Sequence, residues 1–143
     1  MKLKVVLDPG AYMPERAYPE DAGLDLFTPA DFTVFGVTSR EVGSETVNTG
    51  VHIEIPEGYV GMVKSKSGLN INKGLTAEGV IDAGYTGSIR VKLYNHSPFP
   101  RHFKSGEKIA QLVLLPIITP DLVRAEILSE TDRGNNGFGS TGR

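Results

Sequence analysis

The sequence predicts a single all-β domain, and three observations support this. Apolar residues recur with a period of two, as in residues 88–94, where Ile89, Val91 and Leu93 alternate with basic residues. This pattern is typical of a strand with one buried and one solvated face. The short apolar segments are spaced as in a β-sandwich or barrel. Finally, 143 residues is an ordinary length for one domain.

The expected strands follow one another at short intervals. The first lies in the alternating sequence KLKVVL near the N-terminus, and the one at 109–115 is more continuously apolar, which indicates burial on both faces. In chain order, we expect strands at residues 3–7, 24–27, 31–35, 51–55, 59 onward, 77–81, 88–94, 109–115 and 121–128.

Two of these strands are predicted to form a hairpin. Residues 51–55 alternate apolar side chains with His52 and Glu54, and Pro56-Glu57-Gly58 then supplies the residue types that favour a turn. A second strand begins at Tyr59. The turn should therefore join neighbouring antiparallel strands.

Only residues 67–73 are expected to form a helical turn, because Ser67 is a suitable N-cap and Gly74 a suitable terminator. Residues 36–46 are predicted to be an exposed loop between strands.

The C-terminal sequence RGNNGFGSTGR differs from the rest of the chain. Four of its eleven residues are Gly and its only apolar side chain is Phe138, so it cannot bury enough surface to hold itself in place. We therefore divide the chain into a β domain at 1–132 and a Gly-rich arm at 133–143.

Composition excludes several classes of function. The net charge of −2 provides no positive field for a nucleic-acid backbone. The absence of Cys removes disulfides, thiolate zinc sites and Cys nucleophiles, and His52, His96 and His102 lack the spacing of metal ligands. We find no signal peptide, and the longest apolar run, at 112–118, is too short to span a bilayer. We expect a soluble protein of the cytoplasm, or of the host cytoplasm if its source is a virus.

Two segments have the composition of phosphate sites. Lys64-Ser65-Lys66-Ser67-Gly68 places two ammonium groups and two hydroxyls beside a Gly at the start of the expected helix, where backbone N–H groups point outward. In the arm, successive Gly, Ser and Thr residues let N–H groups converge on an anion, and Arg133 adds a charged fork. A solvated loop and a frayed terminus are the alternatives. No GxxxxGK[ST] motif indicates a P-loop.

Four further residues are candidates for chemistry. Asp82 follows a buried strand and precedes a Gly-rich turn, where it could activate a water molecule or simply form the turn. Tyr85 in that turn is either a packed aromatic or a flat wall against a sugar. Asp25 and Gln111 interrupt apolar strands, so each must find hydrogen-bond partners or serve a site.

Five segments, taken together and in order, resemble the motifs of homotrimeric deoxyuridine triphosphatases (dUTPases). They span nearly the whole chain: AGLDL (22–26), KSKSGL (64–69), GVIDAGYTG (79–87), GEKIAQLV (106–113) and RGNNGFGSTG (133–142). The resemblance implies a jelly-roll (β-clip) domain that forms homotrimers. It further implies hydrolysis of dUTP to dUMP and pyrophosphate with Mg²⁺, at sites over which a neighbouring subunit's arm closes.

The resemblance also implies residue roles. Asp82 would deprotonate the water that attacks the α-phosphorus, Gln111 would help to hold that water, and Asp25 would hold Mg²⁺ through bound water. Tyr85 would stack on deoxyribose and exclude a 2′-hydroxyl. Three further sets of residues are expected to bind substrate. Lys66, Ser67 and Gly68 would contact the phosphates, and Thr76, Gly79, Val80 and Ile81, together with Arg90, would bind the nucleoside, with backbone groups of the 76–82 hairpin reading uracil. From the C-terminal arm, Arg133 would meet the γ-phosphate, Phe138 would lie over uracil, and Gly139, Ser140 and Thr141 would surround the phosphates.

This chain departs from the family pattern at three positions. Lys66 stands where Arg is usual, which keeps the charge but loses the bidentate fork. Gly84 stands where Asp is common, and Thr76 where bacterial members often have Asn.

Three alternatives remain at this point. A dCTP deaminase of the same fold would need an additional acid and normally lacks the Gly-rich arm. A regulatory relative that binds another protein would present residues 36–46 as its surface. A purely structural trimer would have no use for acid, amide, hydroxyl and arm residues placed together.

Overall fold

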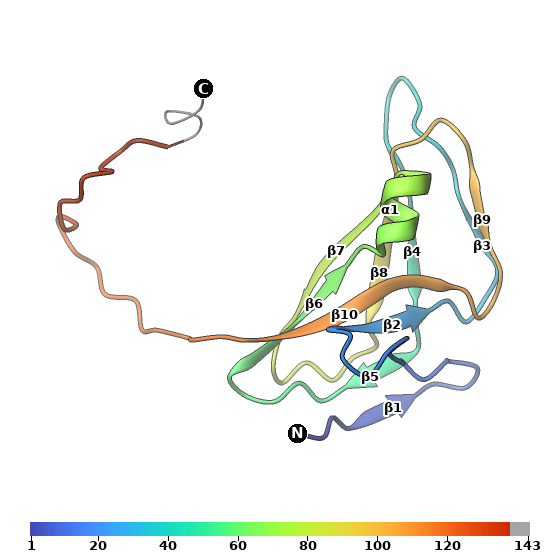
Figure 1. The fold of residues 1–143 in the computed structure, drawn as a ribbon, viewed down its shortest axis with the longest axis horizontal. Helices are drawn as coiled ribbons and strands as arrows, with labels where there is room; N and C mark the ends of the chain where they lie inside the picture. Colours follow the sequence, from blue (N-terminus) through green and yellow to red (C-terminus); the bar gives the residue numbers. More distant parts are fainter. Residues whose placement is uncertain (138–143) are drawn as a thin grey trace.

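The computed structural model describes residues 1–137. Figure 1 shows a curled β domain with one short helix, and a C-terminal segment that leaves it. The elements are β1 (Val5–Leu7), β2 (Gly23–Phe27), β3 (Phe32–Val34), β4 (Gly43–Asn48), β5 (Val51–Ile53), β6 (Tyr59–Lys64), α1 (Ser67–Lys73), β7 (Leu75–Ile81), β8 (Arg90–Asn95), β9 (Arg101–Phe103) and β10 (Lys108–Pro116). The all-β prediction is confirmed. No helix among the described residues is long and apolar enough to span a membrane.

Three antiparallel sheets enclose one core. The large sheet has the order β2-β10-β6-β7-β8-β4, and two small sheets pair β1 with β5 and β3 with β9. Each contributes buried side chains to one cluster, including Leu112 from β10, Ile53 from β5 and Phe103 from β9. The alternation predicted for 88–94 is confirmed, because Ile89, Val91 and Leu93 are all buried.

The predicted hairpin is wrong. Tyr59 N–H does bond the Pro56 carbonyl, so the turn exists. However, β5 pairs with β1, whereas β6 pairs with β10 and β7. Ile55, beyond the end of β5, is buried in the core. The chain therefore passes from a small sheet to the large one instead of folding back on itself.

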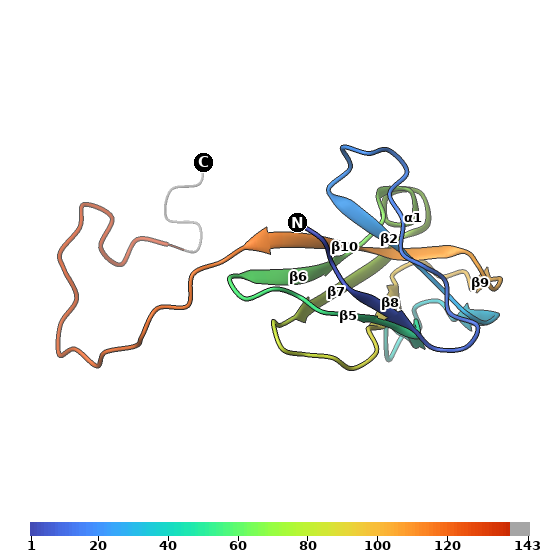
Figure 2. The same ribbon diagram turned by 90° about the horizontal axis from the view of Figure 1, so that it is seen from below.

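Two other strand expectations need correction. Residues 121–128 form no strand; their apolar side chains, such as Leu122, are exposed and the segment runs away from the domain (Figures 1 and 2). A strand needs a partner edge, which local composition does not supply. Conversely, the end of the expected 36–46 loop belongs to β4, which pairs with β8. Val47 is its only buried residue, so it lacks the apolar alternation of a core strand.

The helix α1 forms where expected, but its start is different. Lys66 is the N-cap and makes no side-chain capping bond, whereas Ser67 is already helical. The Ser67 cap is therefore wrong. Gly74 terminates the helix as predicted: its φ of 68° is left-handed, and its N–H bonds helix carbonyls.

Candidate functional site

A cavity lies where β7 and β8 separate. Its volume is about 250 Å³, and its lining consists of five residues that were predicted to form the site: Val80, Ile81, Asp82, Tyr85 and Arg90. The pairing of β7 with β8 covers only residues 75–77 of β7. Beyond Ala77, among the described residues, the edge of β7 that faces β8 makes no strand pair. Its backbone groups are therefore available to a ligand.

The turn after β7 holds Asp82 and Tyr85. Tyr85 N–H bonds the Asp82 carbonyl at 3.2 Å, and Gly84 supplies the positive φ of 86°. Tyr85 donates its hydroxyl proton to the Ser88 carbonyl at 3.0 Å. Its ring lies over Gly87, where an added Cβ would lie 2.5 Å from the ring carbon Cζ. Gly87 therefore leaves the room that this tyrosine orientation requires.

A second group of predicted residues surrounds Asp25, which is only 3% exposed. Lys66 donates to Asp25 Oδ1, and the Lys108 ammonium lies 2.8 Å from Oδ2. Burial acts to raise the pKa of Asp25, but the hydrogen bonds and charges of both lysines outweigh it and lower that pKa. The carboxylate thus holds two ammonium groups at the large sheet, and Glu15, 3.8 Å from the Lys108 ammonium, balances the second positive charge.

Gln111 lies beside Asp25 in the register of β10 with β2. Its amide donates to the Ser65 carbonyl at 3.0 Å, and Ser65 Oγ exchanges hydrogen bonds with the backbone of Ala77 in β7. A Cβ on Gly23 would lie 2.1 Å from the Gln111 amide oxygen. These bonds connect the KSKSG segment to β10 and β7.

Sequence reasoning considered Ser65 only as a possible phosphate contact, and it missed Lys108 and Gly23 as parts of this group. Two local signals could have indicated them: a Lys inside the apolar motif GEKIAQLV, and a Gly at the start of a strand in AGLDL.

The remaining predicted residues have varied positions. Ser67 and Gly68 are exposed at the start of α1. Thr76 Oγ1 hydrogen-bonds the His96 ring at 2.8 Å, and Gly79 faces Val63 in the β6–β7 pairing.

The predicted residues of the C-terminal arm are only partly described. Arg133 is exposed, in the segment that leaves the domain, and donates to the Asn136 carbonyl at 2.9 Å. Phe138, Gly139, Ser140 and Thr141 lie outside the described residues.

One chain does not bring the two groups together. Lys64 of β6 pairs with Gln111 of β10 on one side and with Glu78 of β7 on the other. The residues around Asp25 therefore lie opposite Glu78, across the strands of the large sheet. Asp82 lies four residues farther along, a distance of about 13 Å for extended chain. Within one chain the predicted site residues therefore form two separate groups.

The described residues do not fit a metal centre built from protein ligands. No cluster of three His, Cys, Asp or Glu side chains among them could hold a metal ion. Asp25, the predicted Mg²⁺ contact, has a buried side chain with an ammonium group at each carboxylate oxygen. The two positive charges disfavour a cation at this position. Its assignment to the metal stays a prediction that these contacts do not support.

Comparison with known proteins identifies the fold and the family. A family model described as dUTPase matches residues 10–142. The deoxyuridine 5'-triphosphate nucleotidohydrolase of Nocardia farcinica is 42% identical over 140 residues, covering 95% of this chain and 82% of that protein. Its counterpart from Clostridium tetani is 37% identical and covers 100% of this chain and 97% of that protein.

Solved structures agree. The dUTPase of Staphylococcus bacteriophage 80alpha with bound dUpNHpp has a TM-score of 0.89 and 32% identity, with 99% of each chain covered. A mutant dUTPase from phage phi11 of S. aureus, which coordinates a structural Mg(II) ion, has a TM-score of 0.80 and 29% identity, covering 91% of this chain and 100% of that one. Phage dUTPases of this kind are described as controlling transfer of virulence genes. The curled β domain is thus the dUTPase jelly roll, and this chain belongs to the dUTPase family.

Proposed function

We propose that this protein hydrolyses dUTP to dUMP and pyrophosphate, and that Asp82 activates the water that attacks the α-phosphorus. The observation that carries the proposal is the cavity between β7 and β8, which is lined by the predicted catalytic residue Asp82 and by four residues expected to bind substrate. A carboxylate at its rim can accept a proton from water within hydrogen-bond reach. Membership of the dUTPase family supports the choice of substrate.

The open edge of β7 supports recognition of uracil by backbone groups. Residues 78–81 have no strand partner on the side of β8 within the described structure. Their N–H and C=O groups can pair with a base as an adjacent strand would. Cytosine reverses the donor and acceptor order at N3 and the exocyclic group, so it would leave buried partners unpaired. Thymine would add a 5-methyl group that a tight cavity excludes.

Tyr85 supports selection of deoxyribose. Its ring is held between its hydroxyl bond to Ser88 and the backbone of Gly87, and it lines the same cavity as Asp82. A sugar stacked on this ring would have no space for a 2′-hydroxyl. We therefore assign to Tyr85 the rejection of UTP.

The phosphates would bind at the second group. Lys66, with its neighbour Lys108, provides positive charge, and the exposed N-terminus of α1 offers Ser67 and the Gly68 N–H. Gln111 would hold the attacking water and the α-phosphate region. Mg²⁺ would neutralise phosphate charge while bound mainly to the phosphates and water, in keeping with its reluctance to dehydrate.

Because the two groups are separate in one chain, we propose a homotrimer in which neighbouring subunits combine them. The segment after β10 supports this assembly: Leu122 is 96% exposed and Ile118 88%, and exposed apolar side chains in a row favour a partner surface. The arm of a third subunit would then add Arg133 at the γ-phosphate, Phe138 over the base, and residues 139–141 around the phosphates.

The test is pyrophosphate release from dUTP, dCTP, dTTP and UTP with Mg²⁺. We expect turnover of dUTP alone, near abolition in Asp82→Asn and a strong reduction in a chain that ends before Arg133. Asp31→Asn, which changes an exposed carboxylate just before β3, should stay active. Full activity of Asp82→Asn would reject the mechanism, and release of ammonia from dCTP would favour the deaminase alternative.

A second candidate, a regulatory protein-binding function, draws on the phage relatives. Phe35, which precedes residues 36–46, and Phe99 both have exposed side chains, and the backbones near them meet where Val37 N–H bonds the Ser97 carbonyl. Such a surface suits a protein partner. A pull-down in which the wild-type chain and a variant lacking residues 37–42 capture the same partners would reject this function for the loop.

A further inference from the structure

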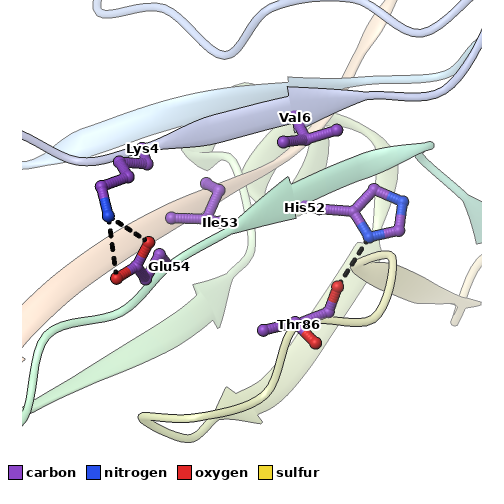
Figure 3. A pocket seen from close by; sticks show the side chains of 6 residues that line it. All are labelled: Lys4, Val6, His52, Ile53, Glu54 and Thr86. Carbon is purple, nitrogen blue, oxygen red and sulfur yellow. Dashed lines mark hydrogen bonds and ion pairs between the residues drawn. The ribbon is translucent and has the colours of Figure 1, made fainter.

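Three segments of the chain meet at His52. It is the central residue of β5, and its neighbours Val51 and Ile53 point into the core, so its ring lies on the opposite face. Nδ1 lies 2.7 Å from the Thr86 carbonyl oxygen, and Nε2 lies 3.2 Å from Asp8 Oδ1. Figure 3 shows the first contact, which joins β5 to the turn between β7 and β8.

Both partners of the ring are hydrogen-bond acceptors. A carbonyl and a carboxylate can be satisfied together only if both ring nitrogens carry protons, as in the imidazolium. The Thr86 bond is the main cause of a raised pKa for His52; partial burial opposes it and Asp8 adds to it. His52 and Thr86 line a second cavity of about 280 Å³ between β1 and β5. Lys4 and Glu54, the other charged groups that line it, form an ion pair with each other.

The bond to Thr86 restrains the middle of the turn, in addition to the Tyr85–Ser88 and Ser88–Asn48 bonds on its C-terminal side. Gly84 and Gly87 flank the Tyr85-Thr86 pair, and glycine leaves the backbone broad conformational freedom. Backbone bonds hold the two ends of the turn: Tyr85 N–H bonds Asp82, and Ile89 N–H bonds β5 at 2.8 Å. At the middle, the Thr86 carbonyl is held by the His52 ring.

We propose that His52 is a positioning residue for sugar selection: it holds the Thr86 carbonyl and thereby keeps Tyr85 against the deoxyribose position. The proposal rests on the proposed dUTP hydrolysis and extends it to a residue outside the five motifs. His52 does not touch the nucleotide. It acts through the turn that carries Tyr85.

The experiment measures kcat/KM for dUTP and for UTP with wild-type, His52→Ala, His52→Asn and His102→Ala proteins. The ratio of the two values does not depend on how much of a preparation is folded, so general destabilisation does not move it. We expect His52→Ala to lower the preference for dUTP about three- to tenfold, the range that one hydrogen bond of ordinary strength supports. His52→Asn should restore most of it, because the amide nitrogen can take the place of Nδ1.

His102→Ala is the matched control. Like His52, His102 forms a hydrogen bond through Nδ1, in this case to Thr33 Oγ1 at 2.8 Å. However, this bond joins β9 to β3 and does not involve the turn that carries Tyr85. Its removal should leave the ratio unchanged. An unchanged ratio in His52→Ala, even with a lower kcat, would overturn the proposal. No turnover of dUTP by the wild-type chain would instead reject the proposed function, and this inference with it.

A pH profile of the wild-type protein provides a test that needs no folded His52 variant. When the ring loses one proton, the shorter Thr86 contact favours the tautomer that keeps Nδ1–H, but the bond is no longer charge-assisted and weakens. We expect the preference for dUTP over UTP to decline as pH rises through the raised pKa of His52. Asp8→Asn should move the decline to lower pH. A wild-type preference that is constant from about pH 6 to about pH 9 would contradict the proposal.

Discussion

Replacing Asp25 by Asn should destabilise the fold far more than the same change at Asp31. Both carboxylates bind lysine ammonium groups at similar distances, 2.8 Å to Lys108 and 2.7 Å to Lys104. They differ in burial, since the Asp25 side chain is 4% exposed and that of Asp31 is 57% exposed. The pair of variants therefore compares a buried carboxylate that holds two ammonium groups with an exposed one that holds a single ammonium group.

The expected size follows from what each lysine can do once the charge is gone. Removing one partner of a fully buried pair costs about 3–5 kcal/mol. Here the lysine side chains are 27% and 38% exposed, so their ammonium groups can partly rehydrate, and Asn keeps one acceptor. We expect a loss of about 2 kcal/mol in unfolding free energy for Asp25→Asn, and little change for Asp31→Asn.

The dependence on pH has a definite sign. The two lysines lower the pKa of folded Asp25 below the ordinary value of 3.8. Its stabilising contribution is then fully present above the unfolded pKa and is lost as pH falls through the lower folded pKa. The difference between wild type and Asp25→Asn should be constant at neutral pH and should shrink only below about pH 4.

The assay is urea unfolding at a fixed protein concentration, because assembly also contributes to stability. The chain has no Trp, so far-UV circular dichroism is the appropriate signal. Equal midpoints for Asp25→Asn and Asp31→Asn would refute the reasoning, since burial would then make no difference.

Three further changes have expected outcomes. Gly87→Ala puts a Cβ into the Tyr85 ring, so the kcat/KM preference for dUTP over UTP should fall; an unchanged preference would contradict the position assigned to Tyr85. Gly74→Ala places a side chain at a φ of 68° and should cost about 1 kcal/mol in a urea titration. Leu112→Ala empties a fully buried position and should cost about 3 kcal/mol; a loss below that of Gly74→Ala would refute its place in the core.

Much of the fold was predictable because it follows from local patterns. The alternation in 88–94 predicted a half-buried strand, and the strand at 109–115 also formed, between β2 and β6 in the large sheet. Gly74 was recognised as a helix terminator because a left-handed residue at that point suits glycine. The dUTPase resemblance, which rested on five ordered motifs, is confirmed by the family match to residues 10–142.

The errors have a common physical cause. The hairpin after residue 55 failed because a turn specifies a change of direction, whereas the partner of each strand depends on the rest of the sheet. The segment 121–128 has strand-like composition but no edge to pair with. β4 pairs with β8 but buries only one residue. Its sequence therefore has no apolar alternation from which the strand could be predicted.

By itself, the sequence determined the all-β class and the family, because side-chain period and motif order are properties of neighbouring residues. Only the tertiary structure decided which groups meet: the separation of β7 from β8 that opens the cavity, the two lysines on Asp25, and the bond from His52 to Thr86 across 34 positions. Such contacts depend on strand pairing between distant segments, and no local pattern encodes that pairing.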